Sequence, residues 1–165
     1  MLVKAKKTSL TSFIHKKYHL INKIVVLFVY LKHQPTRKMD SKKEIVFIVN
    51  PISGTHSKEF ILHQIEKRLD HSLYNYTIRK TEYAGHAIEI ARQAAEEKKD
   101  IVVAIGGDGT INEIGRSLIH TDTAMGIIPC GSGNGLARHL HIPLEARGAI
   151  DVLNQAILKP SITER

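Results

Sequence analysis

The residues best suited to chemistry are Gly106-Gly107-Asp108-Gly109-Thr110, which follow an apolar run at 101–105 and precede a helical pattern. An apolar strand that ends in glycines lets the backbone turn sharply and come close to a ligand, because glycine tolerates positive φ and has no Cβ. A helix from about Thr110 would direct its unpaired N–H groups and the positive end of its dipole at the same place. The sequence therefore predicts a phosphate-binding turn, although a simple tight turn has the same composition.

Asp108 within this turn limits which kinds of ligand the turn could bind. A carboxylate among phosphates is repulsive unless a divalent metal or the proton of a reacting hydroxyl lies between them. The chain has no G-x-x-x-x-G-K-[ST] motif, and Gly131-Ser132-Gly133-Asn134-Gly135 lacks the last spacing of the dinucleotide fingerprint. The pattern indicates nucleotide chemistry rather than passive anion binding.

Alternating strand and helix patterns must position this turn. Strands are expected at 44–49, 74–79, 101–105 and 125–128, and helices begin near Ser57, Gly85 and Thr110. This rhythm is typical of a parallel sheet covered by helices on both faces, a three-layer, Rossmann-like α/β domain whose ligands bind at the carboxyl ends of the strands. The apolar faces of the helices are predicted to carry Ile61, Leu62, Ile65 and Leu69, then Ile88, Ala91 and Ala95, then Ile111, Ile114 and Leu118, and finally Ile150, Leu153 and Ile157.

The positive charge is confined to one end of the chain. The 165 residues carry a formal charge of +8, with 24 Lys and Arg against 16 Asp and Glu. Residues 1–38 hold nine of the basic residues and no acidic one, so 15 basic residues remain against all 16 acidic ones. Because a nucleic-acid surface needs clustered Lys and Arg on the domain itself, no nucleic-acid partner is expected.

Residues 1–38 are interpreted as a basic leader, disordered or preceding the true start at Met39, and residues 39–165 as the folded domain. The apolar run at 24–31 is too short to span a bilayer, which takes about 20 residues, and no small-residue cleavage pattern follows it. No transmembrane segment is therefore expected. A basic peptide that lies on an anionic membrane is the alternative.

The single cysteine, Cys130, excludes an internal disulfide and fits a reducing compartment. It follows a predicted buried strand, so it is interpreted as a small residue at the edge of the core rather than as a nucleophile. The histidines show no metal-ligating spacing, and no metal-binding residue is assigned.

Four separated stretches together resemble one family. They are Asn50-Pro51-Ile52-Ser53-Gly54, then 81–87 (TEYAGHA), then 106–113 (GGDGTINE), and finally 128–138 (IPCGSGNGLAR). In this order they are similar to the diacylglycerol kinase catalytic domain, which sphingosine kinases and bacterial lipid kinases share. The resemblance covers roughly residues 44–142.

The resemblance implies that a nucleotide binds in all four stretches. Ser132 takes the place of the family's Thr or Ser beside the nucleotide, and Asp108 is the implied catalytic residue. For Asn50, Thr81 and Asn112, capping of local backbone groups is the alternative role. The implied ATP-binding residues are Asn50, Pro51, Ser53, Gly54, Thr81, Gly106, Gly107, Asp108, Gly109, Thr110, Asn112, Glu113, Gly131, Ser132 and Asn134.

The implied reaction is transfer of the γ-phosphoryl group of ATP to a lipid hydroxyl, with Mg²⁺ as cofactor. The family's enzymes carry a second, β-rich domain that binds the lipid, and no matching motif occurs in residues 143–165. The chain is therefore expected to be the nucleotide-binding half of a lipid kinase, located in the cytoplasm, peripheral to the membrane that holds the lipid acceptor. The full-length form could be a homodimer.

Two other functions stay open. NAD kinases and phosphofructokinases also carry a G-G-D-G-[TS] turn, which makes a kinase of soluble metabolites the enzyme alternative. A catalytically inactive nucleotide-binding fragment is the other, because no second-domain motif follows.

Overall fold

Four parallel strands form one sheet in the order β2-β1-β3-β4, in a computed structural model that describes residues 41–53 and 57–158. The strands are β1 (Lys43–Val49), β2 (Tyr74–Lys80), β3 (Ile101–Gly106) and β4 (Ala124–Pro129). The predictions for the leader and for Gly54 lie outside the described residues.

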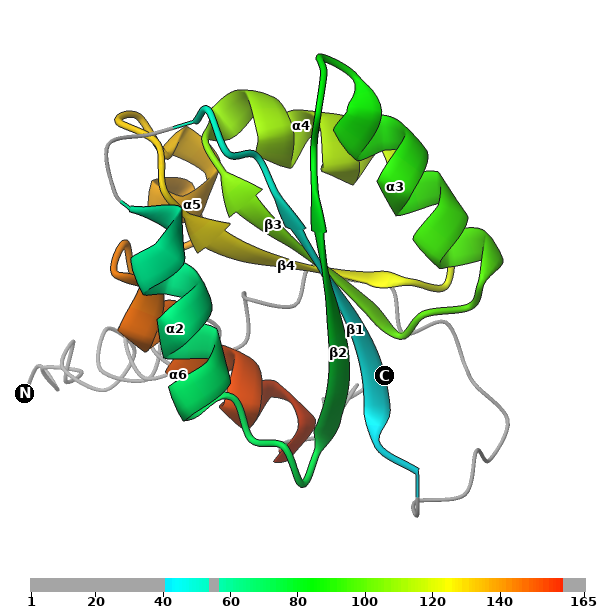
Figure 1. The fold of residues 1–165 in the computed structure, drawn as a ribbon, viewed down its shortest axis with the longest axis vertical. Coiled ribbons are helices and arrows are strands. Elements are labelled where there is room, and N and C mark those ends of the chain that lie inside the picture. Colours follow the sequence, from blue (N-terminus) through cyan, green and yellow to red (C-terminus); the bar gives the residue numbers. More distant parts are fainter. Residues whose placement is uncertain (1–40, 54–56, 159–165) are drawn as a thin grey trace, which may run out of the picture.

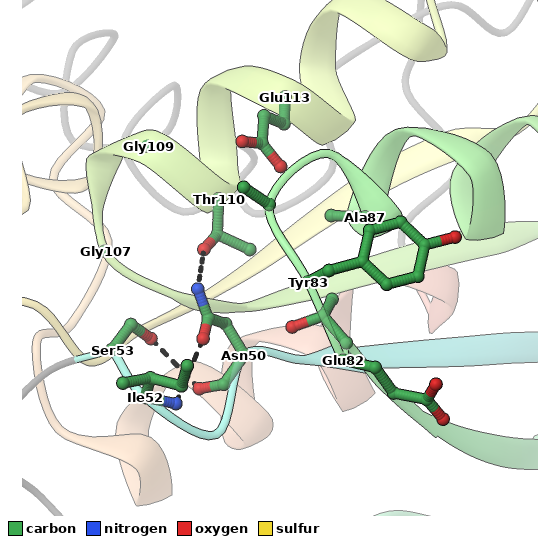
Figure 2. Close-up of a pocket in the computed structure, with 12 residues that line it drawn as sticks. Asn50, Ile52, Ser53, Glu82, Tyr83, Ala87, Gly107, Gly109, Thr110 and Glu113 are labelled. Atoms are coloured by element: carbon green, nitrogen blue, oxygen red, sulfur yellow. Dashed lines mark hydrogen bonds between the residues drawn. The ribbon is translucent and has the colours of Figure 1, made fainter.

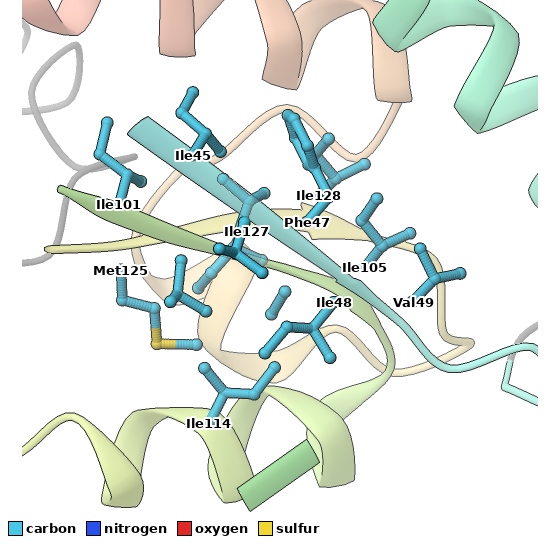
Figure 3. Packing of buried hydrophobic residues seen from close by; sticks show 14 of the residues in the cluster. Ile45, Phe47, Ile48, Val49, Ile101, Ile105, Ile114, Met125, Ile127 and Ile128 are labelled. Atoms are coloured by element: carbon cyan, nitrogen blue, oxygen red, sulfur yellow. The ribbon is translucent and has the colours of Figure 1, made fainter. Parts of the chain in front are cut away.

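The central strands are buried along nearly their whole length. All of β3 and residues 45–49 of β1 are buried, because both faces of the sheet are covered by helices. Strand β2 lies at one edge of the sheet and is largely exposed after Tyr74. Figure 3 shows side chains of the core between the strands and α4, among them Ile48, Ile127 and Ile114.

Helices cover the sheet in two layers (Figure 1). Helices α3 (His86–Glu96) and α4 (Asp108–Ser117) pack together on one face, and α2 (Lys58–Arg68) packs with α6 (Ala146–Leu158) on the other. The short helix α5 (Gly135–His139) follows β4. This arrangement confirms the predicted three-layer α/β fold.

Helix α2 begins where the sequence predicts. The hydroxyl of Ser57 accepts a hydrogen bond from the Phe60 N–H (3.4 Å), which satisfies one of the unpaired amides of the first turn. Ile61 and Ile65 are buried, as expected for the apolar face. An Arg68–Asp151 ion pair (2.8 Å) links α2 to α6 on the surface.

Two details of the helix predictions were wrong. Helix α4 begins at Asp108 rather than near Thr110, so the aspartate belongs to the first helical turn. The buried face of α3 is formed by Ala87, Ile90, Ala91 and Ala94, whereas Ile88 and Ala95 are only half-buried. The shift arises because α3 packs against both α4 and strand β1, so its buried face is set by two neighbours rather than one.

Candidate functional site

The loops that follow the four strands meet at the carboxyl edge of the sheet, and three of them enclose a pocket of about 370 Å³ (Figure 2). The loop after β1 contributes Asn50, Ile52 and Ser53 to its lining. The segment after β2 contributes residues 81–84 and Ala87, and the turn after β3 contributes Gly107, Gly109, Thr110 and Glu113. The pocket lies where parallel α/β sheets bind their ligands.

Asn50 joins the first loop to α4. Its Nδ2 donates to the Thr110 hydroxyl (3.2 Å), and its Oδ1 accepts the Ile52 N–H (3.0 Å). The Ser53 hydroxyl donates to the Asn50 carbonyl (3.1 Å). Asn50 therefore makes the local contacts that were its alternative role, and it does so while lining the pocket.

Thr110 packs against the end of β3 because Gly106 has no side chain. A Cβ at Gly106 would lie 2.7 Å from the Thr110 Cβ and 2.8 Å from its Oγ1. Glycine at this position thus keeps the Thr110 hydroxyl within reach of Asn50. Gly106 shapes the site from behind the pocket.

The start of α4 presents backbone amides to the pocket. Gly107 is the N-cap, in an extended conformation with φ −89° and ψ −174°, and it has no side chain with which to cap the helix. The first helical hydrogen bond runs from the Ile111 N–H to the Gly107 carbonyl (3.1 Å). The amides of residues 108–110 precede it, so the helix offers them, with its positive dipole end, to an anion.

The loop after β4 is closed by its own asparagine. The Asn134 Oδ1 accepts the Gly131 N–H (2.9 Å), and the Asn134 Nδ2 donates to the Gly131 carbonyl (2.7 Å). Asn134 is buried and has a left-handed backbone with φ 52°, a conformation that asparagine tolerates better than most residues. Ser132 is exposed at the tip of this loop.

The two glycine-rich loops are in close contact. A Cβ at Gly131 would lie 2.7 Å from the Gly107 Cα, and a Cβ at Gly133 would lie 2.7 Å from the Asp108 Oδ2. Asp108 is exposed, and its carboxylate lies against the backbone of Gly133. The loop after β4 therefore restricts where the Asp108 side chain can point.

Seven of the predicted nucleotide-binding residues line the pocket: Asn50, Ser53, Thr81, Gly107, Gly109, Thr110 and Glu113. Thr81 is buried there, with its N–H donating to the Val49 carbonyl (2.9 Å). The others that the structure describes lie outside the lining. Pro51 and Asn112 are exposed, Gly106 lies behind Thr110, and Asp108, Gly131, Ser132 and Asn134 form the neighbouring pair of loops.

Residue-by-residue reasoning missed part of the lining. Ile52, Glu82, Tyr83, Ala84 and Ala87 belong to the stretches that carried the resemblance, but no binding role was assigned to them. The available signal was their position after a predicted strand, at the edge where the other loops gather. Cys130 is buried at the end of β4, which confirms that it is a small residue at the edge of the core.

Within residues 41–53 and 57–158, no cluster of three or more His, Cys, Asp or Glu side chains could hold a metal ion. Over the same ranges, no helix combines the length and the apolar character that crossing a membrane requires.

Glycine-rich loops and a helix N-terminus at the carboxyl edge of a parallel sheet are the arrangement with which many α/β domains bind phosphate-containing ligands. Residues 44–163 match the diacylglycerol kinase catalytic domain, and the chain belongs to this family of lipid kinases.

Individual relatives agree with this assignment. The chain is 34% identical to a diacylglycerol kinase of Staphylococcus epidermidis over 114 residues, which cover 68% of the chain and 36% of the relative. It is 35% identical to the diacylglycerol kinase of Bacillus subtilis over 121 residues, or 72% of the chain and 40% of the relative. A crystal structure of a diacylglycerol kinase from Bacillus anthracis superimposes with a TM-score of 0.60 at 25% identity, and the match covers 68% of the chain and 42% of that protein. The match thus spans about two fifths of each relative.

Proposed function

We propose that this chain is the ATP-binding part of a lipid kinase that transfers the γ-phosphoryl group of ATP to a lipid hydroxyl. The observation that carries the proposal is the joint placement of the two glycine-rich loops and Asp108 at the N-terminus of α4, in a chain of this family. Phosphoryl transfer depends mostly on positioning and on electrostatic stabilisation. Both can be supplied here by backbone amides and by the carboxylate of Asp108.

The donor set fits a nucleotide triphosphate. The amides of residues 108–110 suit phosphate oxygens, and the hydroxyls of Thr81 and Thr110 suit phosphate or ribose groups. Asp108 would hold Mg²⁺ together with the phosphates, since hard divalent cations prefer carboxylate, phosphate and water oxygens. The bound Mg²⁺ would offset the charge that develops on the phosphates.

Binding of a lipid acceptor, a location at the cytoplasmic surface of the membrane, and pairing into a homodimer of the full-length form belong to the same proposal. They rest on family membership, since the relatives described above are diacylglycerol kinases. The acceptor is proposed only as a chemical class, a hydroxyl group of a lipid.

Calorimetry of ATP binding to the 165-residue chain, with and without Mg²⁺ and with NAD as competitor, tests the nucleotide part of the proposal. We expect saturable ATP binding that Mg²⁺ strengthens and NAD does not displace. Displacement by NAD would favour a kinase of soluble metabolites. A folded sample that binds neither nucleotide would contradict the proposal for this chain.

Asp108→Asn tests the chemistry. We expect it to lower phosphorylation of diacylglycerol by at least about 10²-fold, the size typical for loss of one group that stabilises a transition state. The assay uses a chimaera that joins this chain to the remaining carboxyl-terminal part of the Bacillus subtilis relative. Asp122→Asn is the matched control, because Asp122 is also exposed but precedes β4, at the opposite edge of the sheet. Equal activity of the two variants would remove Asp108 from the mechanism.

A further inference from the structure

The charge of the pocket indicates which part of a nucleotide it holds. Its charged lining residues, among those the structure describes, are Glu82 and Glu113, and no Lys, Arg or His contributes to the lining. Two carboxylates repel a triphosphate, whereas the amides at the start of α4 attract it. If the chain binds ATP as proposed above, the phosphates face Gly107 and Gly109, and the uncharged base and ribose extend toward the segment after β2.

That segment carries an aromatic ring held in a fixed position. The rings of Tyr83 and His86 are stacked, with centroids 4.4 Å apart and planes 2° from parallel. The Tyr83 hydroxyl donates to the Glu89 Oε2 (2.7 Å), and the His86 Nδ1 accepts the Glu82 N–H (3.1 Å). Figure 2 shows the Tyr83 hydroxyl directed away from Asn50 and Thr110, so the ring rather than its polar end is presented to the pocket.

These contacts leave much of the ring available to a ligand. Tyr83 lines the pocket and stays 54% exposed even though His86 covers one side of the ring. The hydrogen bond to Glu89 raises the pKa of the Tyr83 phenol, a group that is neutral across the physiological range even at its ordinary pKa. A neutral, exposed aromatic ring whose rotamer is already fixed binds a planar partner at a low cost in side-chain entropy.

We propose that Tyr83 stacks on the base of bound ATP and is a specificity-determining residue of this site, with His86 and Glu89 as its positioning residues. The proposal rests on the proposed ATP site and adds the contact that distinguishes a nucleoside triphosphate from a bare triphosphate. The competing explanation is that the Tyr83–His86 stack only braces the start of α3. The two differ in what the ring does to the affinity for ligands with and without a base.

The test compares the dissociation constants of ATP and inorganic triphosphate, each with Mg²⁺, for the wild-type chain and for Tyr83→Ala. Base stacking predicts that Tyr83→Ala weakens ATP binding by about 5- to 100-fold, because one base–aromatic stack has that effect, and leaves triphosphate binding within about twofold. Tyr83→Phe keeps the ring and should retain most of the ATP affinity. Phe60→Ala is the matched control, because it removes a 46% exposed aromatic ring that does not line the pocket.

Tyr83→Trp gives a second, independent readout. The chain has no tryptophan, so this variant carries a single indole at the proposed stacking position. We expect ATP to quench its fluorescence and inorganic triphosphate to leave it unchanged. This readout serves equally if the alanine variant fails to fold.

Each outcome separates the two proposals. ATP binding that Tyr83→Ala does not weaken, or that it weakens as much as triphosphate binding, overturns the stacking role and leaves the ATP site standing. Absence of ATP binding to the folded wild-type chain overturns both.

Discussion

Two glycine-rich loops follow neighbouring strands, one at 106–110 after β3 and one at 131–135 after β4, and they differ in what surrounds their glycines. Among the described residues, nothing lies within 4 Å of a Cβ built on Gly109, whereas Cβ atoms on Gly131 and Gly133 would each come within 2.7 Å of the other loop. The open glycine lines the pocket and the crowded ones do not. In the first loop, Gly109 leaves room for a ligand. In the second, glycine lets one loop lie against another.

The helices that follow the loops reinforce this difference. The first loop leads into the ten-residue helix α4, with no side chain to cap it, so its first-turn amides are available to an anion. The second leads into the five-residue helix α5 and is closed on itself by Asn134. The second loop thus supports the first. Substitutions in the second loop should therefore change stability, and substitutions in the first loop should change ligand binding.

Gly131→Ala should have the largest effect on stability. Its Cβ would meet the backbone of Gly107 at 2.7 Å and the Asn134 Oδ1 at 3.1 Å, and backbone cannot move aside as a side-chain end can. We expect the free energy of unfolding to fall by about 1–3 kcal/mol, the usual cost of overpacking. Chemical denaturation measures it. An unchanged midpoint would mean that the loops are not packed as closely as their geometry indicates.

Gly133→Ala should have a smaller effect on stability and a more specific one on the site. The added Cβ meets the Asp108 Oδ2, the far end of a side chain that can rotate away, so we expect less than about 1 kcal/mol of destabilisation. The carboxylate would then leave its present position. The strengthening of ATP binding by Mg²⁺, measured by calorimetry, should decrease toward the level of Asp108→Asn. Full retention of the Mg²⁺ effect would show that the position of Asp108 does not depend on this loop.

The sequence was sufficient to predict the buried strands and the first glycine-rich loop. Uniform apolar runs predicted the buried strands β1 and β3, and the glycines after β3 together with the following helical pattern predicted a turn between β3 and a helix, although that helix begins two residues earlier than expected, at Asp108. These features depend on local composition and on periodicity, which a single sequence displays directly. The resemblance to a family added the expectation that the ligand is ATP.

The roles of individual residues were not predictable in the same way. Gly109 and Gly131 are the same residue type in the sequence. Only the folded structure shows that a Cβ would meet open space at Gly109 and the backbone of the other loop at Gly131. Asn134 was assigned to the nucleotide, but both polar ends of its side chain are hydrogen-bonded to Gly131. Tyr83 was passed over because its stacking on His86 becomes visible only once α3 is in place. Such contacts are tertiary, or depend on where a helix begins, and composition does not encode them.

Gly109→Ala should have the smallest effect on stability, and unlike the two preceding substitutions it should not destabilise the fold. Gly109 is the second residue of α4, its Cβ would meet open space, and alanine is a better helix former than glycine, so we expect the free energy of unfolding to stay the same or rise by up to about 1 kcal/mol. The added methyl group would project from a residue that lines the pocket, and ATP affinity should fall because the phosphates are expected to approach the backbone there. Denaturation and calorimetry on the same sample measure the two effects. A stabilised variant with weakened ATP binding would assign the first loop to the ligand, whereas unchanged ATP affinity would place the phosphates elsewhere and remove the distinction between the two loops.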